Sequence, residues 1–85
     1  MKLVLAKRFR RDLEKFLKSR PQLKPKVSKS LKFLQNNINH PSLRLHKLSG
    51  TNNWSISVTQ DIRIIIHWER ETIYLLRIGT HDEVY

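Results

Sequence analysis

The chain has 85 residues, enough for one domain with one core, and its 17 lysines and arginines against seven acids give a formal net charge of +10. It has no cysteine, which excludes a disulfide framework and a thiolate zinc site and is compatible with a reducing compartment. So large a positive excess on a small domain indicates a polyanion, such as RNA or DNA, or an acidic protein as its partner.

The first predicted elements are a short strand and a basic amphipathic helix. Residues 2–5 are apolar apart from Lys2 and are followed by a basic segment, which is typical of a short buried strand. From residue 6 to residue 20, apolar side chains recur at helical spacing on one stripe while basic side chains occupy the rest. The N-terminal stretch is too short for a signal-peptide core or a membrane span, so we expect a cytoplasmic location.

A second helix is predicted after Pro21, because proline suits the first turn of a helix and restricts the residue before it. Beyond residue 42 the apolar period changes to two, which predicts three or four antiparallel strands. The order β-α-α-β-β-β predicts a single α+β domain spanning residues 1–85. In this domain a two-helix hairpin packs on one face of a small antiparallel sheet.

Alternation along the strands sorts side chains between the helix-covered face and an open face. Burying the even-numbered isoleucines of residues 62–66 sends Arg63 and His67 to the open face. On the last strand we expect Arg77 on the open face, and the residues predicted to meet the helices are Tyr74, Leu76 and Ile78. Trp54 and Trp68, each in an alternating strand, are predicted to be structural.

The C-terminal segment brings further chemistry toward the same face. If Gly79 releases the chain, His81 and Tyr85 return toward the two arginines. Guanidinium groups stabilise the charge that develops on a phosphate under attack, and an imidazole, with an unperturbed pKa of about 6.5, transfers protons near neutrality. The plain alternative is that the arginines are ordinary solvated sheet residues, and the pattern alone does not decide.

Three segments carry a resemblance to a known family. "LHKLSGTNNWSISV" (residues 45–58), "DIRIII" (61–66) and "LLRIGTHDEVY" (75–85) together resemble the RelE/ParE superfamily of bacterial type II toxins, closest to its RelE and YafQ branches. The resemblance implies an mRNA interferase, which enters the ribosomal A site, cuts the mRNA there and is silenced by a cognate acidic antitoxin. It also implies that cleavage needs no metal, since the RNA's own 2′-hydroxyl attacks the adjacent phosphate.

The resemblance implies roles for individual residues. Arg77 matches the arginine that clamps the scissile phosphate, and Arg63 stands where RelE has its middle-strand arginine. His81 matches the YafQ-type general acid. Tyr85 matches the aromatic residue that stacks on a base or assists proton transfer.

The general base stays open at this point. His46 matches the YafQ-type histidine before the sheet, a possible base or phosphate contact, and Asp61 stands where YafQ-like toxins have an acid. The chain departs from RelE at Ser55 and Ser57, where RelE carries lysines. It also lacks the second histidine that YafQ has ahead of its acid.

No metal site is predicted, because the four histidines contain no acid-flanked i, i+4 pair, and we expect no cofactor. Basic side chains favour contact with RNA phosphates, which adds affinity without sequence choice; those assigned to this role are Lys7, Arg8, Arg11, Lys15 and Lys47. Two other functions stay open: a ParE-like gyrase poison on the same fold, and a basic RNA-binding domain without chemistry.

Overall fold

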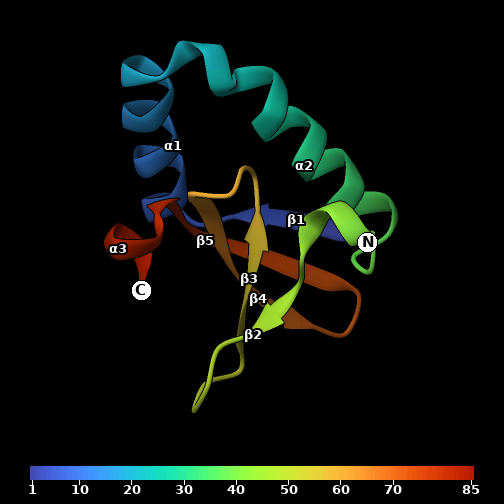
Figure 1. The fold of residues 1–85 in the computed structure, drawn as a ribbon. Helices are drawn as coiled ribbons and strands as arrows, with labels where there is room; N and C mark the ends of the chain where they lie inside the picture. Colours follow the sequence, from blue (N-terminus) through green and yellow to red (C-terminus); the bar gives the residue numbers. More distant parts are fainter.

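The computed structural model describes residues 1–85 and shows two helices above one face of a five-stranded sheet (Figure 1). Short 3-10 turns at Pro21–Leu23 and Pro41–Leu43 follow the two long helices. None of the helices is long and apolar enough to cross a bilayer. The elements are β1 (Lys2–Leu5), α1 (Lys7–Ser19), α2 (Lys24–Asn36), β2 (His46–Lys47), β3 (Asn53–Ser57), β4 (Ile62–Glu69), β5 (Thr72–Thr80) and α3 (His81–Val84).

The core lies between the sheet and the two long helices. Phe9 and Phe16 of α1 and Leu34 of α2 are buried against isoleucines of β3 and β4. Trp54 and Trp68 pack against this core and meet each other edge to face, with ring centroids 5.8 Å apart. The prediction that both tryptophans are structural is therefore confirmed.

The sheet has the strand order β1-β5-β4-β3-β2. β2 to β5 form an antiparallel meander, whereas β1 pairs with β5 in parallel. The parallel pair is possible because the chain between β1 and β5, which contains both long helices and the other three strands, supplies the long connection that such a pair requires. The predicted α+β fold is confirmed, and the sheet that carries it is mixed.

A β-bulge in β5 changes which side chains of this strand face the helices. Ile65 lies opposite Arg77 and Ile66 lies opposite Leu75, which leaves Leu76 without a partner. Before the bulge, Leu75 is fully buried in the core, and after it Ile78 is 4% exposed. The expectation that Tyr74 and Leu76 meet the helices was wrong, because the extra residue reverses the alternation.

The bulge predicts a large difference between two neighbouring leucines. Leu75→Ala leaves a cavity in the core and should lower the free energy of unfolding by about 2–5 kcal/mol. Leu76→Ala, at the half-buried bulge position, should cost clearly less. Urea denaturation of both variants measures this difference. A larger loss for Leu76→Ala would contradict the bulge.

Candidate functional site

Three rows of paired residues cross the face of the sheet that points away from α1 and α2. The middle of this face is closely packed, since Ser55 is only 1% exposed and Ile65 is buried outside the main core cluster. The polar side chains that are able to take part in a reaction therefore lie around a closely packed, solvent-excluded centre. In strand order the rows are His46–Ser55–Ile65–Arg77, Ser57–Arg63–Gly79 and Asn53–His67–Tyr74.

Arg63 lies on the central strand β4, between Ser57 and Gly79 of the neighbouring strands. One terminal nitrogen of its guanidinium, Nη1, donates a hydrogen bond to the Ser57 hydroxyl. Its Nε–H is buried and has no acceptor. Since a buried donor without an acceptor is costly, this N–H destabilises the arrangement around Arg63.

Arg77 lies one strand away, where β1 has already ended. The last contact between β1 and β5 is the bond from the Ala6 N–H to the Leu75 carbonyl, so α1 borders the rest of β5. The register places Arg77 opposite Ile65, but its side chain turns toward α1. There its Nε lies 3.4 Å from Oδ2 of Asp12, with side-chain exposures of 31% and 22%.

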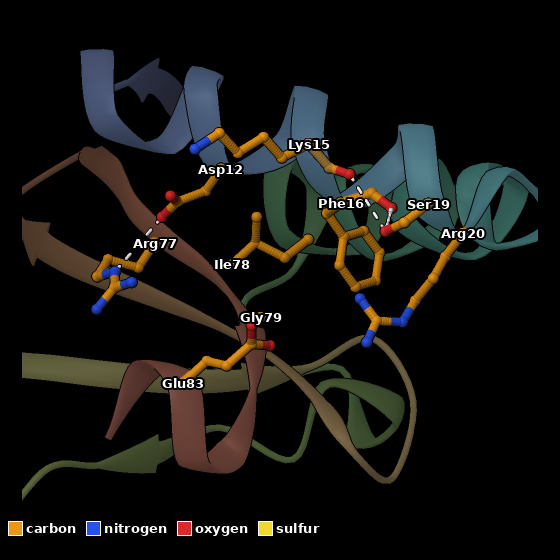
Figure 2. A pocket seen from close by; sticks show the side chains of 9 residues that line it. All are labelled: Asp12, Lys15, Phe16, Ser19, Arg20, Arg77, Ile78, Gly79 and Glu83. Carbon is orange, nitrogen blue, oxygen red and sulfur yellow. Dashed lines mark hydrogen bonds and ion pairs between the residues drawn. The ribbon is translucent and has the colours of Figure 1, made fainter.

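A groove of about 160 Å³ runs between α1 and the end of β5 beside this ion pair (Figure 2). Its charged lining consists of three cations, Lys15, Arg20 and Arg77, and two acids, Asp12 and Glu83. Neither acid was predicted from the sequence as a site residue. A signal for Asp12 was present, because it lies at the border between the apolar stripe and the basic stripe of α1.

The short helix α3 is fixed at its start by a capping box. The Thr80 hydroxyl accepts from the Glu83 N–H at 3.3 Å, and the Glu83 carboxylate accepts from the Thr80 N–H at 2.8 Å. The pKa of Glu83 is lowered, most strongly by the hydrogen bond from the Thr80 backbone and next by the hydrogen bond with the Thr80 side chain. The positive charges of Arg20 and Arg77 lower it further. Glu83 therefore stabilises α3 as a carboxylate.

Gly79 provides the space in which α3 packs on the sheet. A Cβ at this position would lie 3.2 Å from Cγ1 of Val84 and 3.2 Å from Oε1 of Glu83, closer than ordinary contact. Because Gly79 pairs with Arg63, this packing places α3 next to the arginine of the central strand.

The structure brings the His81 and Tyr85 side chains together at this end of the sheet, next to the backbone of Asp61. The ring centroids of His81 and Tyr85 are 4.1 Å apart. The backbone N–H of His81 donates a hydrogen bond to the backbone carbonyl of Asp61 at 3.1 Å. The His81 side chain is 60% exposed, and its Nδ1 lies 3.5 Å from the Asp82 carboxylate. An imidazole and a phenol thus stand at the rim of the face that carries Arg63.

His46 stands apart from this group. It is exposed on the edge strand β2, three strands from Arg77 in the same row, which corresponds to about 14 Å along the sheet. Lys47 next to it lies over the Trp54 ring, with Nζ 5.9 Å from the centroid. The predicted basic residues of α1 are exposed along one stripe of the helix: Lys7, Arg8, Arg11 and Lys15.

Several solved structures with a similar fold are described as toxins. A copper-bound mutant toxin from Helicobacter pylori has a TM-score of 0.84 at 23% identity, covering 100% of this chain and 99% of that one. The E. coli DinJ-YafQ toxin-antitoxin complex matches at 0.83 and 19% identity, over 99% and 96%. A YoeB/ParE toxin from Agrobacterium tumefaciens matches at 0.78 and 16% identity, over 95% and 99%.

The family follows from the sequence itself. Residues 1–85 match the family model described as "Bacterial toxin of type II toxin-antitoxin system, YafQ", and the chain belongs to this family. No curated protein sequence matches the chain. The resemblance to the RelE and YafQ toxins is thereby confirmed.

The lowered pKa of Glu83 predicts how α3 responds to pH. The carboxylate stabilises α3 above its ordinary pKa of 4.5, and this contribution is lost as the pH falls through the lowered value. At neutral pH, Glu83→Ala should loosen α3, because it removes the acceptor of the capping box, whereas Glu71→Ala removes the same charge in the exposed β4–β5 turn and should not. The NMR shifts of the Tyr85 ring, displaced by the adjacent His81 ring, measure this. Equal shift changes in both variants would contradict the capping role.

Proposed function

We propose that this toxin is a ribosome-dependent endoribonuclease that cuts mRNA in the ribosomal A site without a metal ion. One observation supports the proposal: the backbone positions of Arg63, Arg77, His81 and Tyr85 lie at one end of the sheet, on two adjacent strands and in the segment that follows them. Two cations beside a proton-transfer group suit the cleavage of a phosphodiester. The family membership supports a toxin that acts by such chemistry.

In the proposed reaction, the 2′-oxygen of the RNA attacks the adjacent phosphorus as its proton passes to a base. The bond from phosphorus to the 5′-oxygen breaks, which leaves a cyclic phosphate and a 5′-hydroxyl. Arg63 and Arg77 stabilise the charge on the nonbridging oxygens, each by about 3 kcal/mol if they match a typical oxyanion donor. His81, exposed at the rim, protonates the departing 5′-oxygen.

We assign the role of the base to Asp61 in preference to His46. The Asp61 backbone bonds to the first residue of α3, whereas His46 lies across the sheet from Arg77. We assign His46 a phosphate contact on a neighbouring nucleotide. Tyr85, at an exposed end of α3, stacks on a base, the common mode of contact with single-stranded RNA.

The partners follow from charge. A net charge of +10 favours the ribosome, whose RNA is a polyanion, and an acidic antitoxin that neutralises the toxin. The E. coli YafQ toxin is found in complex with DinJ, which supports an antitoxin partner for this chain as well. The basic stripe of α1 and Lys47 then bind phosphates of RNA.

Removal of the reacting groups should abolish toxicity. Arg77→Ala and His81→Ala should each lower mRNA cleavage by about 100-fold or more and relieve growth arrest, because they remove transition-state stabilisation and proton transfer. Primer extension on programmed ribosomes measures the cleavage. Arg10→Ala, on the other side of α1 from Asp12, is the matched control.

Three outcomes would contradict the nuclease proposal. Cleavage unchanged in both variants would remove the assigned roles. Trapped complexes of cut DNA with gyrase, in place of cut mRNA, would favour the ParE-like poison. Tight salt-dependent RNA binding without any strand scission would favour a plain RNA-binding domain.

The basic stripe predicts salt-dependent ribosome binding. Arg11→Gln should weaken binding at every mRNA sequence and reduce the slope of log affinity against log salt by about 0.7 to 0.9, the value for one lost phosphate contact. Sedimentation with ribosomes over a range of KCl concentrations measures the slope. Lys2→Gln on β1 removes the same charge away from the stripe and should leave the slope unchanged, so equal slopes in both variants would exclude the contact.

A further inference from the structure

We infer that Asp12 is a positioning residue for Arg77: it fixes the plane of this guanidinium so that its two terminal nitrogens are presented to the scissile phosphate. The inference rests on the proposed function and deepens it, because it adds a residue of α1 to the reacting site. The contact is the 3.4 Å pair between Nε of Arg77 and Oδ2 of Asp12, which joins residues 65 positions apart in the sequence.

The burial of Asp12 separates it from the other acids. Six of the seven acids of the chain are exposed, and Asp12 alone is half-buried. Arg8 lies one turn before it and Lys15 one turn after it on α1, within the reach of an ordinary helix pair. Its carboxylate nevertheless pairs with Arg77 of β5, so the fold directs this acid toward the reacting arginine.

The atoms of the pair suit a positioning role. A guanidinium is planar and carries five N–H donors, of which Nε supplies one and the two terminal nitrogens supply four. With Nε held by Asp12, the terminal nitrogens keep their donors for the bidentate geometry that phosphate favours. An arginine without such a partner would occupy many rotamers, and only a fraction of them would place the terminal nitrogens next to the scissile phosphate.

The groove beside the ion pair connects the residues proposed to bind RNA phosphates with the residues proposed to cleave the RNA. Lys15, on the basic stripe of α1, lines the same groove as the pair, and Glu83 of α3 lies at its other side (Figure 2). The charges of Arg20 and Arg77 help to keep Glu83 ionised. Asp12 therefore connects α1, whose basic residues are proposed to bind phosphates, to Arg77 of β5. Helix α3, which carries His81, borders the other side of the groove through Glu83.

The test compares Asp12→Asn, Asp12→Glu and the control Glu14→Gln in single-turnover cleavage on programmed ribosomes. Glu14 is an exposed acid of the same helix, so its replacement removes the same charge without the contact. Asp12→Asn should lower kcat by about 100-fold with little change in KM, the expected cost of a misplaced catalytic group. Asp12→Glu, which keeps the carboxylate, should retain more activity, and Glu14→Gln should match the wild type.

Two further measurements separate positioning from a structural role. Added to Arg77→Ala, Asp12→Asn should cause no further loss of cleavage, because its effect passes through the arginine. Thermal denaturation should show a change in Tm of less than about 5 °C for Asp12→Asn, since a partly exposed ion pair contributes little stability. A full additional loss in the double variant would overturn the inference.

NMR of the Arg77 Nε–H group decides the matter without activity. In the wild type its resonance should show slow rotation and protection from solvent exchange, and Asp12→Asn should remove both. Unchanged Arg77 resonances, or faster cleavage by Asp12→Asn, would overturn the inference, the second because Asp12 would then compete with the phosphate. A wild type that cleaves nothing would contradict the proposed function alone, and the NMR result would still decide whether Asp12 fixes Arg77.

Discussion

The bulge at Leu76 is the constraint on which the site depends. Without it, strict alternation would put Leu75 and Arg77 on one face, and an arginine would then point into the core. One unpaired residue allows both Leu75 and Ile78 to be buried while the Arg77 side chain stays out of the core and reaches Asp12 of α1. The burial of two apolar side chains and the partial exposure of the Arg77 cation are thus both made possible by a local break in the sheet.

The end of the sheet then gathers the remaining groups. Gly79, two residues after Arg77, has no side chain to keep α3 away, and the capping box of Thr80 and Glu83 starts that helix at once. A helix of one turn is not stable by itself, so its position depends on these caps and on the sheet beneath it. The position of His81 beside β4 and β5 therefore depends on the backbone at Gly79 and on the carboxylate of Glu83.

Electrostatics in this chain serves both folding and function. A net charge of +10 opposes compaction through self-repulsion, and the chain has only seven acids to offset it. Asp12 and Glu83 stand on two sides of one groove, next to Arg77 and Arg20. A partner that supplies further negative charge, whether RNA or an acidic protein, stabilises the folded state by binding to it.

The sequence by itself determined the α+β fold, the two amphipathic helices, the structural tryptophans and the family, because periodicity and short motifs are local properties. It did not determine the parallel pairing of β1 with β5, the bulge at Leu76, or the ion pair between Arg77 and Asp12. These features depend on which residues lie opposite each other across strands and helices far apart in the chain. Only the folded structure decides that, since a shift of one residue in register exchanges the faces of a strand.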